Sequence, residues 1–265
     1  LRLENFVFLC LGQANMDAIK DSRERIKHRE ATLSKLLRER IVLIDGAMGT
    51  MIQKCKLTEE DFRGERFKDW KRDLKGNNDL LNLTRPEVIR DIHLEYLRAG
   101  ADIIETNTFN AQAVSLADYG MESLAYELAH SGASVAREAA DLFMKECPER
   151  TAFVAGAIGP TTKTASVATD NENPAARDIT YNQLVDAYYE QAKGLVEGGA
   201  DLLIVETIFD TLNSKAAFFA CEKLIKDMGF SVPLMASVTF IQAGSNRGMT
   251  GQTVEAFWNS INHVP

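Results

Sequence analysis

Acidic side chains directly follow two short apolar runs of the sequence. Asp45–Gly46 comes after Ile41–Ile44, and Glu206 ends the run Leu202–Val205. If both runs are strands of one parallel sheet, their carboxyl ends meet at one edge, where a carboxylate can pair with a ligand's ammonium group. For Asp45–Gly46 the alternative is a plain tight turn. For Glu206 the alternative is a helix cap or an ion pair with Lys215.

A further polar cluster, Glu105–Thr108, follows the run Ile103–Ile104. Successive side chains of a strand point to opposite faces, so we expect Glu105 and Asn107 on one face and the two threonines on the other. Only one of these pairs can then face a common cavity. We take Glu105, Asn107 and Thr207 as additional candidate binding residues.

The other reactive residue types predict neither a nucleophile nor a metal site. The histidines occur in predicted helices or near the terminus, and the cysteines are far apart with no Cys-x-x-Cys spacing. A cysteine within a helix is more often a small buried hydrophobic residue than a nucleophile. We therefore assign no catalytic residue and no metal ligand. The residues concerned are His28, His93, His130 and His263, and Cys10, Cys55, Cys147 and Cys221.

Composition restricts the possible partners and the compartment. The chain has 265 residues, of which 45% are hydrophobic and 26% charged, as is usual for a folded globular protein. Its 30 basic and 38 acidic residues give a net charge of −8, so we expect neither nucleic acid nor an anionic membrane as a partner. No apolar run approaches the roughly 18 residues that span a bilayer. The run Phe6–Leu11 is only a weak match to a signal peptide, and the cysteine spacing favours the cytoplasm.

Apolar runs and helical periodicity alternate along the chain. A Ser/Thr-x-x-Glu/Gln spacing, which caps helix starts, occurs at Thr84–Glu87 and Thr180–Gln183. Further helices are expected at about 122–145, 212–227 and 251–262. The predicted strands are 41–44, 103–104, 153–155, 202–205 and 234–238. Strands that alternate with helices in this way must be parallel.

A short repeat supports a repeating β/α unit. Gly100-Ala-Asp102 precedes the second predicted strand, Gly199-Ala-Asp201 precedes the fourth, and a glutamate ends each of the two strands. Both a doubly wound sheet and a barrel fit this order. Polar residues at three strand ends and the absence of a Gly-x-Gly-x-x-Gly motif favour the barrel.

The predicted fold is therefore α/β, of the (β/α)8 TIM-barrel type. Closure of such a barrel needs eight strands, so we expect it to be truncated after about five. Within this organisation, residues 1–15 are an extension of no recognised family, 16–40 an amphipathic helix, and 41–265 a partial barrel. The long segment 159–180 would lie at the barrel mouth, as a lid or an interdomain contact.

Several segments together resemble the homocysteine-binding domain of cobalamin-dependent methionine synthase. The resemblance extends from about Leu33 to Asn262. Four segments carry it. They are Ile44–Gln53, the stretch from Gly76 to Phe109 that includes Gly76–Leu81, Thr84–Glu87 and Gly100–Phe109, then Asn173–Thr180, and Val205–Asn213.

The resemblance implies a methyltransferase in which the barrel mouth holds homocysteine with its thiol bound to zinc. The thiolate would attack a methyl group carried on cobalamin, to give methionine. Glu206 matches the family's acidic group for the substrate ammonium, and Asp45 and Gly46 match the motif beside the substrate. The implied partners are homocysteine and the folate-, cobalamin- and activation-type domains of a full-length enzyme.

The family's zinc ligands are three cysteines that follow the sixth and the last strands. None of the four cysteines present matches these positions, so we expect the ligands downstream of residue 265 and the chain alone to be inactive. A second hypothesis is a truncated, non-catalytic binding module without zinc. A third, which we disfavour, is an enzyme that uses Asp45 and Glu206 as acid and base.

Overall fold

The computed structural model describes residues 22–168, 170, 172–240, 246–248 and 251–264. The predicted extension 1–15, Cys10, the run Phe6–Leu11 and the start of the predicted helix 16–40 lie outside these residues. Within the described ranges, no helix combines the length and the apolar character that crossing a bilayer requires.

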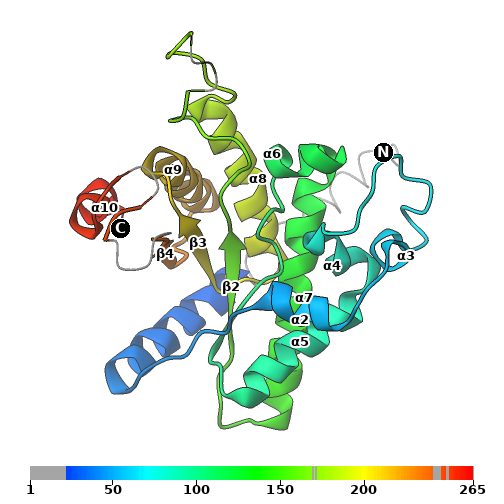
Figure 1. Cartoon of the computed structure of the whole chain (residues 1–265). Helices are drawn as coiled ribbons and strands as arrows, with labels where there is room; N and C mark the ends of the chain where they lie inside the picture. Colours follow the sequence, from blue (N-terminus) through cyan, green and yellow to red (C-terminus); the bar gives the residue numbers. More distant parts are fainter. Residues whose placement is uncertain (1–21, 169, 171, 241–245, 249–250, 265) are drawn as a thin grey trace, which may run out of the picture.

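Four parallel strands form one sheet in the order β1-β2-β3-β4. A helical connection separates each strand from the next (Figure 1), so the predicted α/β fold with parallel strands is confirmed. The arrangement is consistent with part of a TIM-type barrel. The strands are β1 (Ile103–Glu105), β2 (Phe153–Ile158), β3 (Leu202–Ile208) and β4 (Leu234–Val238).

The predicted strand at 41–44 is reduced to a single bridge. Ile44 pairs in parallel with Ile103, and the carbonyl of Leu43 accepts the N–H of Ile103 at 3.0 Å. Ile41 is 82% exposed and Leu43 53% exposed. The N–H of Leu43 donates to the Asp102 carboxylate at 3.0 Å and not to a backbone carbonyl of a neighbouring strand, so the pairing of 41–44 is limited to this bridge. The prediction of five strands was therefore wrong by one.

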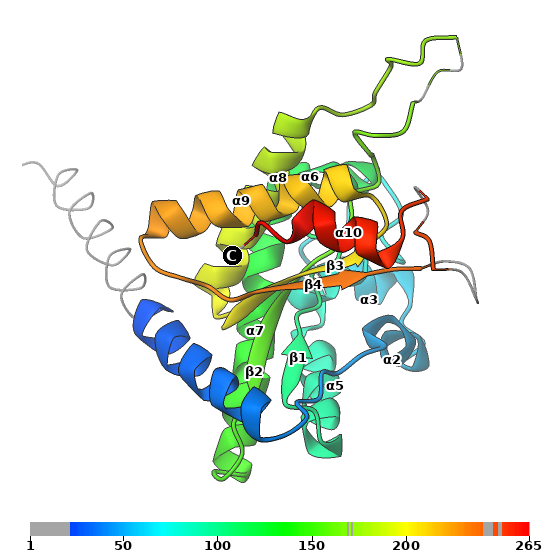
Figure 2. The ribbon, with the colours of Figure 1, turned by 90° about the vertical axis from the view of Figure 1, so that its left-hand side faces the viewer.

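Four long helices cover one face of the sheet and pack side by side (Figures 1 and 2). They are α5 (Pro86–Ala99), α7 (Ala125–Glu146), α8 (Tyr181–Gly198) and α9 (Thr211–Met228). α10 (Val254–Ile261) lies against α9. The shorter helices are α2 (Met48–Lys54), α3 (Glu59–Arg63), η1 (Asn78–Leu80), α4 (Leu81–Thr84), α6 (Ala113–Leu116), η2 (Ala117–Tyr119) and η3 (Glu122–Leu124).

The two faces of the sheet belong to different hydrophobic clusters. Ile104, Leu203 and Val205 pack in the large core beneath the long helices. Leu202 and Ile204 point the other way, into a smaller cluster that contains Leu33 and Leu36 of helix 22–39. Helix 22–39 therefore covers the inner face of the sheet near the amino ends of the strands (Figure 2).

One of the two predicted capping boxes is present. Thr180 accepts the N–H of Gln183, and the Gln183 side chain accepts the N–H of Thr180 at 2.9 Å. The prediction of a capping box at Thr84–Glu87 was wrong. Thr84 ends α4 and its hydroxyl donates to the carbonyl of Leu80, while Glu87 binds Arg85, so neither side chain is free to cap α5.

The Gly-Ala-Asp repeat anchors helix 22–39 beneath the sheet. Arg40, just after this helix, donates two hydrogen bonds of 2.7 and 2.8 Å to the buried carboxylate of Asp102. Near its start, Arg25 lies 3.4 Å from the carboxylate of Asp201, which also accepts a bond of 2.8 Å from Arg137. The repeated aspartates thus have a structural role at the amino ends of β1 and β3.

Candidate functional site

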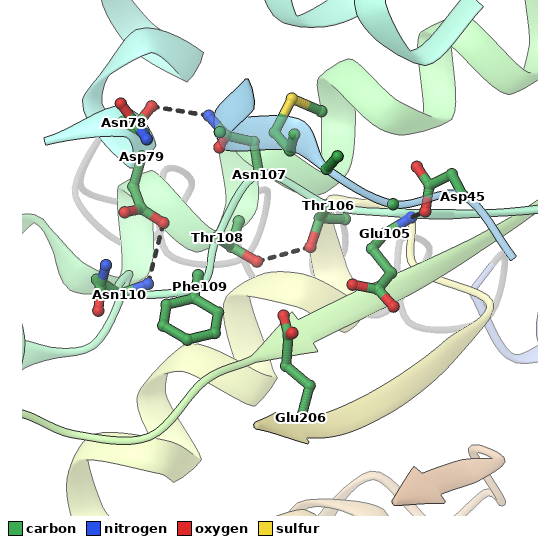
Figure 3. A pocket seen from close by; sticks show the side chains of 14 residues that line it. Asp45, Asn78, Asp79, Glu105, Thr106, Asn107, Thr108, Phe109, Asn110 and Glu206 are labelled. Carbon is green, nitrogen blue, oxygen red and sulfur yellow. Dashed lines mark hydrogen bonds between the residues drawn. The ribbon is translucent and has the colours of Figure 1, made fainter. Parts of the chain in front are cut away.

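A cavity of about 290 Å³ opens at the carboxyl ends of the strands (Figure 3). Its wall consists of residues 45–49, residues 78–79 of η1, Glu105 at the end of β1 with the following residues 106–110, and Glu206 of β3. The parallel sheet brings these distant segments together because each polar segment follows a strand at the same edge. The connection from β2 to α8 projects from this same end of the sheet (Figure 1).

The cavity is strongly acidic. Asp45 follows the bridge to β1, Glu105 ends β1 and Glu206 lies in β3, and Asp79 of η1 adds a fourth carboxyl group. The side chains of Glu105 and Glu206 point toward one another (Figure 3). Among the described residues that line this cavity, none is basic.

Burial and mutual repulsion make these carboxyl groups hold their protons unusually tightly. The pKa of Asp45 rises to about 8, chiefly through burial and with a contribution from the charges of Glu105 and Glu206, although the N–H of Glu105 opposes the change. The pKa of Glu206 rises to about 7, chiefly through burial and then through the charge of Glu105. A cation in the cavity would relieve this repulsion and favour the ionised forms.

Burial also raises the pKa values of the other two carboxyl groups. Burial raises the pKa of Glu105. Burial also raises the pKa of Asp79 to about 6, although the N–H of Asn110 opposes the change. The cavity is therefore partly protonated near neutral pH when it is empty.

The alternative roles considered for Glu206 have no support in the structure. Asp210 caps α9 by accepting the N–H groups of Leu212 at 2.8 Å and Asn213 at 3.2 Å. Within the described part of the chain, no ion pair joins Glu206 to Lys215. Glu206 is thus left facing the cavity.

Residues after Glu105 do not alternate as a strand would, because β1 ends at that residue. Thr106 accepts the N–H of Ala157 at 2.9 Å, and Thr108 donates its hydroxyl to the carbonyl of Ala157 at 2.8 Å. These hydroxyl groups continue the pairing with β2. Asn107 instead donates to the carbonyl of Asn78 at 2.7 Å. All four residues from Glu105 to Thr108 contribute atoms to the cavity lining, but the hydroxyl groups of the two threonines are bonded to β2.

Of the other candidate residues, Asp45 and Gly46 line the cavity and Thr207 does not. Asp45 accepts the N–H of Glu105 at 2.9 Å. Gly46 lines the cavity, and a side chain there would meet no atom within 4 Å, so space remains for a ligand. Thr207 does not line the cavity, but its hydroxyl donates to Glu206 over 3.5 Å.

Several lining residues were missed from the sequence. Asp79, in a segment predicted only as a loop, accepts the N–H of Asn110 at 3.1 Å and so fixes the turn that carries Phe109. The ring of Phe109 and Met48 are the large apolar groups of the lining. The run Asn77-Asn78-Asp79 was the available signal in the sequence, but the burial of Asn77 and Asp79 is set by contacts distant in sequence.

Close packing on Gly159 holds Phe109 in place. The N–H of Gly159 donates to the carbonyl of Phe109 at 3.2 Å. A Cβ at position 159 would lie 2.4 Å from that carbonyl oxygen and 2.8 Å from the ring. Only glycine therefore fits beneath this wall of the cavity.

The described residues do not fit the zinc ion that the sequence resemblance implies. Nowhere in the described ranges do three His, Cys, Asp or Glu side chains come together as possible metal ligands. Cys55 is exposed, Cys147 half-buried and Cys221 buried, and none of them lines the cavity. The cavity thus has carboxylate but no thiolate donors.

The fold and site define an α/β barrel-type domain with an acidic cavity at the carboxyl ends of its strands. The family model described as homocysteine S-methyltransferase matches residues 42–265. The chain therefore belongs to the homocysteine S-methyltransferase family, a family of methyltransferases.

Solved structures of the homocysteine methyltransferase MmuM from Escherichia coli have a similar fold. The oxidized form is 22% identical, with a TM-score of 0.65, and the match covers 88% of this chain and 73% of that one. The metallated form gives 22% identity, a TM-score of 0.65, and coverage of 88% and 74%. The apo form gives 21% identity, a TM-score of 0.60, and coverage of 87% and 71%.

Proposed function

We propose that the acidic cavity binds homocysteine by its ammonium group, for transfer of a methyl group to the substrate sulfur. The observation that carries this proposal is the meeting of Asp45, Glu105 and Glu206 in one cavity whose described lining has no basic residue. An ammonium group supplies the positive charge that these carboxylates lack. Glu206 is the principal partner, because it faces the cavity and takes no part in capping α9.

The size and apolar part of the cavity support an amino acid as the ligand. A volume of about 290 Å³ is at the small end of ligand pockets, which favours a small molecule over a nucleotide or peptide. Phe109 and Met48 offer apolar surface for the methylene groups of the substrate side chain. Gly46 leaves space for the backbone of the ligand.

The finer assignment, to a methionine synthase that uses zinc and cobalamin, is supported by the sequence resemblance alone. Zinc bound to a thiol supplies a deprotonated sulfur at neutral pH. The described cysteines lie outside the cavity, so we assign these residues amino-acid binding and no step at the metal. Folate-, cobalamin- and activation-type domains as partners, a cytoplasmic location, and residues 41–265 as part of one barrel domain belong to the same proposal.

Calorimetric titration with L-homocysteine tests the role of Glu206. We expect Glu206→Gln to weaken binding by about 1.5 to 3 kcal/mol, because a charge-assisted contact is lost. This corresponds to an affinity about 10 to 150 times lower. Glu122→Gln, at an exposed position away from the cavity, is the matched control and should bind as the parent chain does. Equal affinity of the Glu206→Gln variant and the parent would refute the assignment.

A further inference from the structure

Thr207 has a backbone conformation that β-branched residues rarely adopt. Its φ angle is 52°, in the left-handed region. The only other non-glycine residues with positive φ in the described ranges are Ala47 and Lys56. The branched Cβ of threonine makes this conformation strained, and such strain persists only where the surrounding structure imposes it.

The strain coincides with a bulge in β3. Val205 pairs with Ala236 of β4, and Ile208 pairs with Val238. β3 therefore advances three residues where β4 advances two, which leaves one extra residue in β3 at Glu206–Thr207. Bulges of this kind change the direction of the side chains that follow.

The bulge allows Glu206 and Ile208 to lie on opposite faces of the sheet. Ile204 belongs to the inner cluster and Val205 to the helix-facing core, so regular alternation would place both Glu206 and Ile208 on the inner face. Ile208 is instead only 4% exposed within the helix-facing core. Glu206 keeps its place at the cavity while the chain buries Ile208 beneath the helices.

The Thr207 side chain also acts on Glu206 directly. Its hydroxyl donates to the Glu206 carboxylate over 3.5 Å. This contact opposes the effect of burial and lowers the pKa of Glu206. Thr207 thus holds Glu206 through both its backbone and its hydroxyl.

We propose that Thr207 is a positioning residue whose left-handed backbone and hydroxyl fix the Glu206 carboxyl group at the cavity, at the expense of fold stability. The proposal rests on the proposed function insofar as Glu206 contacts the substrate. Thr207 acts by positioning the Glu206 carboxyl group and does not itself contact the ligand.

Two glycine variants distinguish the effect of relieving backbone strain at Thr207 from the effect of relieving the same strain at Lys56, away from the cavity. Thr207→Gly and Lys56→Gly each place glycine at a φ of 52°, and Lys56 is exposed in the turn after α2. Both should raise the urea midpoint of unfolding, because glycine adopts positive φ freely. Only Thr207→Gly should weaken homocysteine binding, by about five- to tenfold, because a flexible bulge no longer holds Glu206 in place.

Two further variants separate the backbone from the hydroxyl. Asparagine tolerates positive φ better than other non-glycine residues, and its side-chain amide can donate to Glu206 in place of the hydroxyl. Thr207→Asn should therefore raise the urea midpoint and keep homocysteine affinity within about twofold. Thr207→Val keeps the strain but loses the hydroxyl. It should leave the midpoint unchanged and raise the pKa of Glu206 in a carboxyl-carbon NMR titration.

The NMR titration of Glu206 needs no ligand and therefore separates this proposal from the proposed function. An upward shift in the Thr207→Gly and Thr207→Val variants, with none in Lys56→Gly, supports the positioning role even if the parent chain fails to bind homocysteine. In that case homocysteine binding is refuted, while the positioning of Glu206 by Thr207 still stands. An unchanged titration, or a Thr207→Gly variant that is stabilised yet binds homocysteine as tightly as the parent, overturns the positioning role.

Discussion

The carboxylate of Asp45 accepts a hydrogen bond of 2.9 Å from the backbone N–H of Glu105. This bond joins the segment after the first bridge to the end of β1, and it places two acidic residues from different parts of the chain beside one cavity. The arrangement concentrates negative charge where a cation is expected to bind. Its consequences can be measured through the pH dependence of stability and of binding.

Asp45 should make the folded chain without ligand less stable as the pH rises. Its pKa is about 8 in the folded chain against an ordinary value of 3.8, so the folded state binds the proton more tightly. The stabilisation is complete below about pH 4 and is lost as the pH rises through 8. We expect Asp45→Asn to lose less stability between pH 5 and pH 8 than the parent in urea unfolding.

Asp69→Asn, at an exposed position, is the control for removal of a charge and should follow the parent. Parallel pH profiles for Asp45→Asn and the parent would contradict the role of Asp45.

Homocysteine binding should strengthen between pH 6 and pH 8 and release protons. Glu206 and Asp45, with pKa values of about 7 and 8, are partly protonated in the empty cavity, and an ammonium group favours their ionised forms. Calorimetric titrations at one pH in buffers of different ionisation enthalpy measure the number of protons released. The Glu206→Gln variant should release fewer, and heats independent of the buffer would argue against an ionised acidic partner.

His93 should make the fold sensitive to acid. Its side chain is fully buried in α5, both ring nitrogens lack a partner among the described residues, and burial lowers its pKa from 6.5 to about 4. The unfolded chain therefore binds the proton more tightly, and stability falls as the pH drops from about 6.5 to 4, by up to about 3 kcal/mol.

Replacement of His93 by leucine should remove that contribution, because leucine is apolar and similar in volume. We expect the loss of unfolding free energy between pH 7 and pH 4.5 to be smaller in His93→Leu than in the parent. A variant as acid-sensitive as the parent would show that other groups cause the effect.

Gly159→Ala should disturb the cavity wall as well as the fold. The new methyl group would lie 2.4 Å from the carbonyl oxygen of Phe109, so the turn that carries Phe109 must move. We expect a loss of about 1 to 3 kcal/mol in unfolding free energy, as is usual for overpacking. Hydrogen exchange should also accelerate at the amide of Asn110, which is bonded to Asp79.

Gly248→Ala is the matched control, because its nearest atoms lie 3.9 Å away and its φ is not in the left-handed region. It should leave both stability and exchange at Asn110 unchanged. Normal exchange at Asn110 in Gly159→Ala would show that Gly159 does not hold the Phe109 turn.

Local sequence patterns were sufficient to predict most elements of the fold and to select three of the four acidic residues that line the cavity. Hydrophobic periodicity located the long helices, and short apolar runs located β1 to β4, because these patterns depend on neighbours within a few residues. The capping box at Thr180 is equally local. Asp45, Glu105 and Glu206 were selected because the carboxyl end of a parallel strand is where an α/β fold exposes polar groups.

The features that depend on distant contacts needed the tertiary structure. Whether residues 41–44 form a strand depends on backbone pairing with residues about 60 positions away, which the run itself does not encode. Asp79 became part of the site only because its carboxylate meets the N–H of Asn110, 31 residues away.

The face on which Glu206 lies is decided in the same way, by register. The sequence alone determines that a glutamate ends an apolar run, but alternation would have placed Ile208 on the same face. Pairing with β4 inserts a bulge at Thr207, and the helix-facing core then buries Ile208. Residue types therefore set which groups are available, whereas strand pairing and core packing, which join distant segments, decide where each group points.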